Sequence, residues 1–273
     1  MQAITDAELL GFSRLMMQAA GIALAPSKKA LVSGRLARRV QALGLQTYAE
    51  YLDHVQRDAA ERQCAVDLLT TNETYFFREP RHFAFLAEQI LPRADSARPF
   101  RVWSAACSSG EEPYSVAMVL AEHLGSRGWE VLASDISTRV LEQARAGIYP
   151  MERAEKIPQA YLKAYCLKGV GAHAGSFRIA PALRERVAFR AINLNAGLPD
   201  VGVFDLILLR NVMIYFDQPT KAQVCQRLAA ALRPGGHLFV GHSESLNGLD
   251  CPLRSLQPAV YRRELPPGAA RSV

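Results

Sequence analysis

The sequence predicts an α/β protein in which a doubly wound, mostly parallel sheet follows a small all-α N-terminal domain. Residues 4–91 carry apolar residues at helical spacing and show none of the alternation that is typical of strands. Further on, short apolar runs alternate with helical stretches, which is the pattern of βαβ units. A polar, helix-breaking segment separates the two patterns. We therefore predict domains at residues 1–91 and 99–273, joined by a linker at 92–98.

The elements of the second domain can be assigned in order along the chain. Strands alternate with helices at residues 100–105, 111–124, 130–134, 137–146, 204–209, 220–232 and 237–241. Strands separated by helices need crossover connections, so they run parallel and helices cover both faces of the sheet. Residues 157–194 interrupt this order with short alternating pieces bounded by glycines, which predicts a small inserted antiparallel sheet. We expect a loose tail at residues 265–273.

Composition excludes several classes of protein. Of the 273 residues, 49% are hydrophobic and 21% are charged, which is typical of soluble globular proteins with a sizeable core. No stretch of about 18 residues is both apolar and uncharged, and the N-terminus lacks a basic run, so we expect neither a membrane span nor a signal peptide. Five scattered cysteines and six scattered histidines predict no disulfide framework and no metal site. A reducing, cytoplasmic location fits best.

Positive charge is concentrated near the N-terminus. The formal net charge is +6, and residues 9–49 contain no aspartate or glutamate. Six basic residues lie in that stretch: Arg14, Lys28, Lys29, Arg35, Arg38 and Arg39. Such a stretch suits an anionic partner, which at this point could be a nucleic acid, a membrane surface or an acidic protein helix.

The loop after the first predicted strand is a candidate ligand-binding turn. Ala106, Ser108 and Gly110 occupy the places of a G-x-G-x-G turn, and in open α/β sheets ligands bind at the carboxyl ends of the strands. Glu111 and Glu112 would repel a dinucleotide at the start of the following helix, so a cofactor with positive or neutral groups is favoured. The alternative is a plain tight turn without a ligand.

Polar residues also follow the later strands. Asp135, about 25 residues past the glycine-containing turn, is placed to bind both hydroxyls of a ribose, with a helix N-cap as its alternative role. Asn211 directly follows an apolar strand and is a candidate cofactor contact. Tyr215 would overhang the reacting atoms, unless it is a core aromatic.

The segment at residues 70–83 combines polar, charged and aromatic side chains, a mixture that folding alone rarely requires. Asn72, Thr74 and Arg78 are candidates to converge on a ligand between the two domains. The alternative is that the segment packs as a lid or a linker.

Five motifs together resemble the CheR family of chemotaxis receptor methyltransferases. They are N-E-T-Y-F-F-R, W-S-A-A-C-S-S-G-E-E-P-Y-S, A-S-D-I-S, R-N-V-M-I-Y-F-D and P-G-G-H-L-F-V-G-H-S-E-S. The match runs in order from about residue 5 to residue 263. The resemblance implies a class I methyltransferase fold, and transfer of a methyl group from S-adenosylmethionine to glutamate side chains on the cytoplasmic helices of chemoreceptors. The products would be glutamate methyl esters and S-adenosylhomocysteine.

The resemblance also implies roles for individual residues. By motif position, the cofactor contacts would be Asn72, Thr74, Arg78, Glu112, Asp135, Asn193, Leu194, Arg210 and Asn211. Arg78 and Tyr215 would line the reacting centre as catalytic residues. The receptor's acidic helix bundle would meet Lys28, Arg35, Arg38 and Arg39, which otherwise form a solvated helix face. Gly169 and Gly171 resemble a loop that binds a receptor C-terminal peptide in some members, although such glycines are also ordinary turn residues.

The implied chemistry agrees with the residue types. A glutamate side chain, with a pKa of about 4.3, is an anion at pH 7, so ester formation needs no general base and no histidine dyad. Two alternative functions compete with this one. The first is a non-catalytic module that binds the cofactor, and the second is a nucleic-acid methyltransferase. Intact Arg78 and Tyr215 disfavour the first. The second usually carries an Asn/Asp-Pro-Pro-aromatic motif that is missing here, so we expect no nucleic-acid partner.

Overall fold

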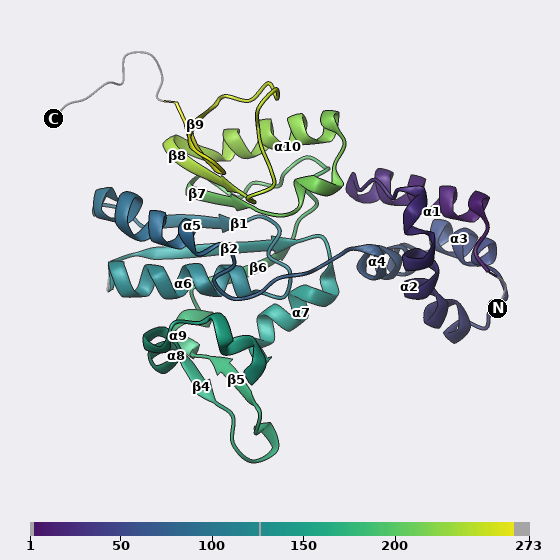
Figure 1. The fold of residues 1–273 in the computed structure, drawn as a ribbon, viewed down its shortest axis with the longest axis horizontal. Coiled ribbons are helices and arrows are strands. Elements are labelled where there is room, and N and C mark those ends of the chain that lie inside the picture. The colour runs from purple at the N-terminus through teal and green to yellow at the C-terminus, as the bar shows by residue number, and fades with distance from the viewer. Residues whose placement is uncertain (1–2, 126, 265–273) are drawn as a thin grey trace.

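In the computed structural model, which describes residues 3–125 and 127–264, a bundle of helices lies beside an α/β unit (Figure 1). The predicted tail at 265–273 lies outside the described residues. The bundle contains α1 (Asp6–Ala20), η1 (Pro26–Lys28), α2 (Lys29–Ala42), α3 (Tyr48–Arg57) and α4 (Ala59–Leu69). Capping boxes begin α1 and α3, where Thr5 pairs with Glu8 and Thr47 with Glu50.

The next helical segment packs with the sheet instead of with the bundle. It consists of α5 (Pro80–Phe85), a π-helical turn at Leu86–Ile90 and a 3-10 turn at Leu91–Arg93. Phe83 and Leu86 share a buried cluster with Val102 of the sheet. The packing therefore changes ahead of α5, earlier than the linker that we predict at residues 92–98.

The main sheet has seven strands in the order β6-β2-β1-β7-β8-β10-β9. They are β1 (Phe100–Ser104), β2 (Trp129–Asp135), β6 (Val187–Ala191), β7 (Phe204–Leu209), β8 (Leu232–Val240), β9 (Leu253–Gln257) and β10 (Val260–Arg263). The first five in spatial order are parallel, whereas β10 is antiparallel to both β8 and β9. The doubly wound, mostly parallel sheet is confirmed, and the antiparallel pair at its edge was not predicted.

Helices cover both faces of this sheet. The long helices of the domain are α6 (Glu111–Leu124), α7 (Thr138–Ala146) and α10 (Gln218–Ala231). Val102 and Leu206 pack with α6 in one buried cluster, and their chain neighbours Trp103 and Ile207 pack with α10 in the other. Because neighbouring residues of a strand point to opposite faces, this division explains why both strands are apolar throughout.

The inserted antiparallel sheet differs in extent from the prediction. It pairs β3 (Ile148–Pro150), β5 (Ser176–Ile179) and β4 (Cys166–Lys168), with η4 (Met151–Lys156), α8 (Gln159–Tyr165) and η5 (Gly171–His173) between them, and α9 (Pro181–Arg184) follows. The piece predicted at 187–190 instead forms β6, which pairs with β2 in parallel at the sheet edge. An edge strand with one exposed face alternates in polarity, so it was mistaken for an antiparallel strand.

Polar contacts fix the bundle against the carboxyl ends of the strands. Asp67 of α4 accepts hydrogen bonds from the Thr138 amide (3.0 Å) and the Thr138 hydroxyl (2.8 Å) at the start of α7. Gln63 donates to the Ile136 carbonyl (2.9 Å), and Asn193 donates to the Ala19 carbonyl (2.6 Å). The bundle therefore covers the edge of the sheet at which doubly wound proteins bind their ligands. Within the described ranges, no helix is both long and apolar enough to cross a bilayer.

Candidate functional site

A cavity of about 280 Å³ lies between the bundle and the carboxyl ends of β1, β2 and β7. All ten residues predicted to contact the cofactor or to line the reacting centre border it: Asn72, Thr74, Arg78, Glu112, Asp135, Asn193, Leu194, Arg210, Asn211 and Tyr215. The bundle adds Lys28, Leu31 and Arg35 to the wall. Segments that are far apart in sequence thus converge on one space, at the place where doubly wound sheets bind ligands.

The small residues in the turn after β1 serve two purposes: some border the cavity, and one is required by packing. Ala106 and Ser108 line the cavity, whereas Gly110 does not. Gly110 has φ +98°, and a Cβ there would lie 2.8 Å from Tyr149 Oη and 2.9 Å from Ala144 Cβ. Gly110 is therefore required by the backbone conformation and by its neighbours, not by the approach of a ligand.

Asp135 ends β2 at the cavity wall. Its carboxylate accepts hydrogen bonds from the amides of Ser108 (2.9 Å) and Ser137 (2.9 Å). The first amides of α7 are capped by Asp67, so the cap of that helix does not depend on Asp135. Burial raises the pKa of Asp135, although the donated hydrogen bonds oppose that shift.

This raised pKa predicts a pH dependence of cofactor binding. If the charged carboxylate holds the hydroxyls of a ligand, affinity falls as pH is lowered through the pKa of Asp135. Because burial raises that pKa, the loss should begin above the ordinary aspartate value of about 3.9. Calorimetric titration of the cofactor at several pH values measures it, with D135N as the control. An unchanged pH profile in D135N would contradict this role of Asp135.

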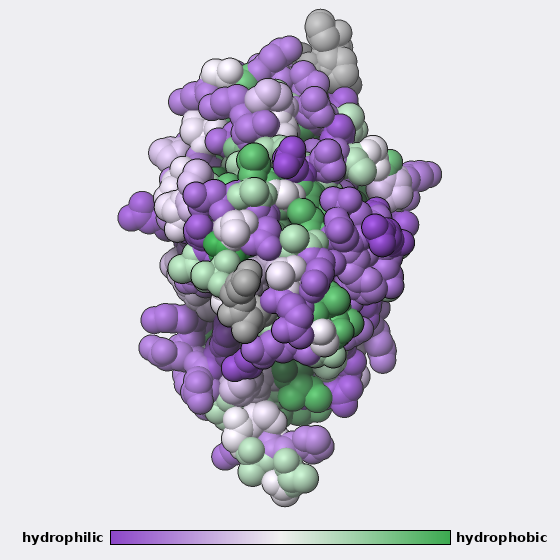
Figure 2. Space-filling view, turned by 90° about the vertical axis from the view of Figure 1, so that its right-hand side faces the viewer, coloured by the Kyte–Doolittle hydropathy of each residue, from purple (hydrophilic) through white to green (hydrophobic). Residues whose placement is uncertain are grey.

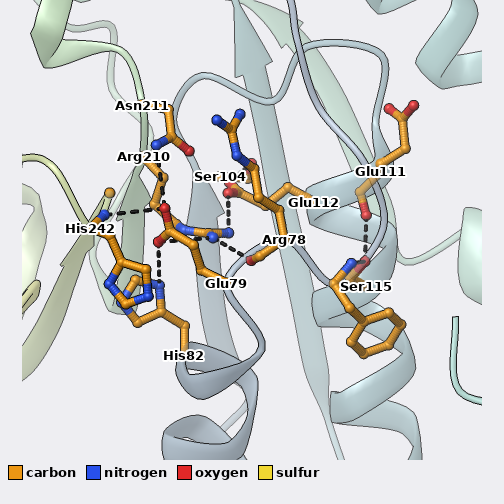
Figure 3. A network of polar contacts seen from close by, with 12 residues as sticks. Arg78, Glu79, His82, Ser104, Glu111, Glu112, Ser115, Arg210, Asn211 and His242 are labelled. Atoms are coloured by element: carbon orange, nitrogen blue, oxygen red, sulfur yellow. Dashed lines mark hydrogen bonds and ion pairs between the residues drawn. The ribbon is translucent and has the colours of Figure 1, made fainter. Parts of the chain in front are cut away.

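Arg210 is the centre of a buried polar network behind the cavity (Figure 3). Its guanidinium donates to Glu112 (2.9 Å), pairs with Glu79 (3.1 Å) and donates to the backbone carbonyl of Arg78. Glu112 also accepts from the Ser104 hydroxyl (2.7 Å). Both Nη atoms of Arg210 are engaged with protein groups, whereas its buried Nε has no partner among the described residues. Arg210 therefore holds neighbouring residues of the cavity wall in place, and its predicted contact with the cofactor stays a prediction.

Glu79 is a member of this network that the sequence analysis missed. Its carboxylate accepts from the His242 amide (3.1 Å) and the Asn211 side chain (3.3 Å), and its own backbone has φ +59°. Burial acts to raise the pKa of Glu79, but Arg210 and the donated hydrogen bonds hold it below the ordinary value. Burial and Arg210 lower the pKa of the adjacent His82 to about 4, so His82 is neutral at pH 7. Arg210 is thus the cation that neutralises Glu79.

The two predicted catalytic residues reach the cavity from different segments. Arg78 donates to the Glu73 carbonyl (2.8 Å), and its guanidinium lies 5.7 Å from the centre of the Tyr75 ring. Figure 3 shows this guanidinium pointing away from the Arg210 network. Tyr215 is half-buried at the end of η6 (Met213–Tyr215), and its backbone carbonyl accepts from the Ala23 amide (3.0 Å). It is not a fully buried core aromatic.

The four basic residues predicted to meet a receptor fall into two pairs: two make contacts within the protein and two are exposed. Arg35 donates to the carbonyls of Leu69 and Thr70, both at 2.9 Å, and therefore caps the end of α4. Arg39 forms a two-point ion pair with the buried Glu61. In contrast, Lys28 and Arg38 are exposed.

The view onto the bundle shows a mostly hydrophilic surface with smaller hydrophobic patches (Figure 2). Arg35 and Arg39 each make contacts with α4 or the residues that follow it, which the charge pattern alone could not reveal, and the Arg39 side chain remains 38% exposed. Lys28 and Arg38 are the more exposed of the four basic residues predicted to meet a receptor, and that contact stays a prediction.

Gly169 and Gly171 lie away from the cavity, in the loop between β4 and β5. A Cβ on Gly169 would lie 2.0 Å from the His173 carbonyl oxygen, and Gly171 has φ +57°. The loop conformation therefore needs both glycines. Val170 between them is 77% exposed, and β4 is an edge strand of the small sheet.

Comparison with known proteins covers nearly the whole chain. Residues 7–70 match the family described as CheR methyltransferase, all-alpha domain, and residues 72–261 match CheR methyltransferase, SAM binding domain. The chain is 47% identical over 244 residues to chemotaxis protein methyltransferase 2 of Pseudomonas aeruginosa, covering 88% of this chain and 87% of that protein.

Two further relatives bear the same description. The chemotaxis protein methyltransferase of Escherichia coli is 44% identical over 253 residues, covering 91% of this chain and 87% of that protein. The one from Borreliella burgdorferi is 36% identical over 273 residues, with 95% of both chains covered. The two family matches meet at residues 70–72, close to where the packing changes from bundle to sheet.

Proposed function

Since the chain belongs to the CheR methyltransferase family and is an S-adenosylmethionine-dependent methyltransferase, we propose that its acceptors are glutamate side chains of chemoreceptor cytoplasmic helices. The products are glutamate methyl esters and S-adenosylhomocysteine. The observation that carries this proposal is the cavity beside the bundle that Arg78, Tyr215 and Lys28 all line. A cytoplasmic location is part of the same proposal, because those receptor helices lie in the cytoplasm.

The wall residues fit the cofactor. S-adenosylmethionine, when bound, supplies a methyl group on a positively charged sulfur. The buried carboxylate of Asp135 suits the ribose hydroxyls, and the negative charge of Glu112 at the wall suits a cationic ligand group. Asn72, Thr74, Asn193, Leu194 and Asn211 complete the binding wall.

The acceptor chemistry needs positioning and needs no proton transfer. A glutamate carboxylate is already a nucleophile at pH 7, so the protein has to hold it in line with the methyl group and keep water out. The guanidinium of Arg78 can hold a carboxylate, and the Tyr215 hydroxyl can donate a hydrogen bond to it. The bundle covers one side of the cavity and so would limit the access of water. None of the wall residues is a histidine.

Receptor docking through the exposed basic residues gives a testable prediction. Charge reversal in the K28E/R38E double variant should raise the KM for receptor, because the acidic helix bundle loses two attractive partners. We expect a rise of about tenfold at low ionic strength and a smaller rise at high salt. R57E, at the exposed C-terminal end of α3, is the matched control and should leave the KM unchanged. A KM for receptor that is unaffected by K28E/R38E would contradict docking at this face.

We further propose that the edge strand β4 and the exposed loop at Gly169–Gly171 take up a receptor C-terminal peptide as an additional strand. A free edge offers unpaired backbone groups to an extended peptide. The arrangement β3-β5-β4 leaves β4 at such an edge, and Val170 is exposed beside it. This contact would tether the enzyme to the receptor without entering the cavity.

The acceptor itself can be tested by mapping the modified residues. Purified protein, S-adenosylmethionine and receptor cytoplasmic domains are incubated, and tryptic peptides are examined by mass spectrometry. The proposal requires methyl groups on glutamates, and their loss when those glutamates are replaced by alanine. Methyl groups on lysine or on nucleic acid instead would refute it.

A further inference from the structure

Three backbone atoms between Thr74 and Arg78 are held by other parts of the chain, and the Asn72 carbonyl just ahead of them accepts a hydrogen bond from the Ser108 hydroxyl (2.8 Å). The Phe77 amide donates to the Ser115 hydroxyl (3.0 Å), and the Arg78 carbonyl accepts from Arg210. Both partners belong to the main α/β unit. The third atom, the Thr74 carbonyl, accepts from Arg153 (2.7 Å), which belongs to the inserted subdomain.

The inserted subdomain also packs against this segment through aromatic rings. Phe76 meets Tyr149 edge-on at 5.0 Å and Phe177 at 5.7 Å between ring centres, and these rings lie on β3 and β5. Phe77 stacks on Tyr161 of α8 at 5.6 Å. The segment that carries Thr74 and Arg78 therefore packs against the inserted subdomain as well as against the main α/β unit.

Arg153 links the inserted subdomain to this segment. It lies in η4, whose first residue, Met151, donates from its amide to the Gly175 carbonyl of the small-sheet hairpin (2.9 Å). Its Nη1 also approaches the buried Glu111 at 3.3 Å, farther than the Thr74 carbonyl. Arg153 remains 49% exposed, so burial alone does not hold it in place.

We propose that Arg153 is a positioning residue that holds the Thr74 carbonyl and so couples the inserted subdomain to the cofactor-binding segment. The proposal rests on the proposed role of Thr74 in cofactor binding. Without the guanidinium, Thr74 loses its hydrogen bond to the inserted subdomain, while the contacts of Asn72, Phe77 and Arg78 with the main α/β unit remain. Because only the hydrogen bond at the Thr74 end of the segment is lost, we expect cofactor binding to weaken more than the chemical step slows.

The test compares R153A, R153K and K156A in the full-length protein. R153A should raise both the Kd and the KM for S-adenosylmethionine on the order of tenfold, which is the loss of one charge-assisted hydrogen bond, with a smaller effect on kcat. R153K retains a donor and should recover most of the affinity. K156A removes an exposed charge from the same turn and should match the parent protein. Calorimetry gives the Kd without any receptor, so a wrong acceptor would not affect this result.

The variant R153A/E111Q separates the two partners of Arg153. If Arg153 serves only as the countercharge of Glu111, removing both charges should restore the affinity for S-adenosylmethionine, and that restoration would overturn the proposal. If Arg153 acts through Thr74, the double variant should bind as weakly as R153A. Parent-like affinity in R153A would also overturn it. Should R153A fail to fold, R153K against R153Q applies the same test, with recovery expected only in R153K.

Discussion

Replacing Arg78 by alanine is expected to lower kcat for methyl transfer by roughly 10²–10³, the usual cost of losing a group that stabilises charge at the reacting centre. Among the described residues, the Arg78 side chain donates one hydrogen bond, to the Glu73 carbonyl, so the rest of its guanidinium is available for the cavity. Removal of the side chain leaves its backbone carbonyl in place for Arg210. Initial rates with labelled S-adenosylmethionine and saturating receptor measure the effect.

Two further measurements define the role of Arg78. R78K keeps the charge but loses the planar two-point geometry, so it should lie between the parent and R78A. The thermal stability of R78A should stay close to that of the parent, because the hydrogen bond and the aromatic contact of this side chain both lie within its own segment, at Glu73 and Tyr75. Near-normal turnover in R78A at saturating substrates would refute the assignment.

Loss of Arg210 is expected to cause the largest change in stability. In R210M, Glu79 and Glu112 would remain buried without a countercharge, which costs about 3–5 kcal/mol in the free energy of unfolding. The side chains of all three are nearly inaccessible, at 1% for Arg210, 9% for Glu79 and 10% for Glu112. Urea unfolding of parent and variant at pH 7 measures the difference.

Two measurements distinguish unpaired buried charge from a packing defect as the cause of the lost stability. In R210M/E79Q/E112Q no buried charge is left unpaired, so much of the lost stability should return. The deficit of R210M should also shrink as pH is lowered, because buried carboxylates without a countercharge have raised pKa values and take up protons in the folded state. A deficit that is independent of pH, and that persists in the triple variant, would show that packing dominates.

Local patterns predicted the elements that build the site. The apolar run and the small-residue turn predicted β1, and the predicted limits of α6 and β7 agree with the structure. Asp135 was singled out because it ends a predicted strand about 25 residues past the small-residue turn, and the structure places it at the carboxyl edge of the sheet. Such features depend on a few neighbouring residues.

Features that depend on distant partners could not be found in this way. Glu79 is defined by contacts with Arg210 and His242, more than 130 residues further along the chain. The charge pattern predicted Arg39 as a docking residue and could not reveal its ion pair with Glu61, which belongs to another helix. The edge position of β6 follows from its pairing with β2, which its own alternation does not reveal.

The most direct test of the proposed acceptor is the chemical nature of the bond that carries the transferred methyl group. The protein is mixed with methyl-labelled S-adenosylmethionine and receptor-containing membranes, and the washed membranes are treated with mild base. A carboxyl methyl ester is hydrolysed under these conditions, so we predict that the bound label is released as methanol. Label that is incorporated but resists base, as a methyl group on nitrogen would, contradicts glutamate methylation.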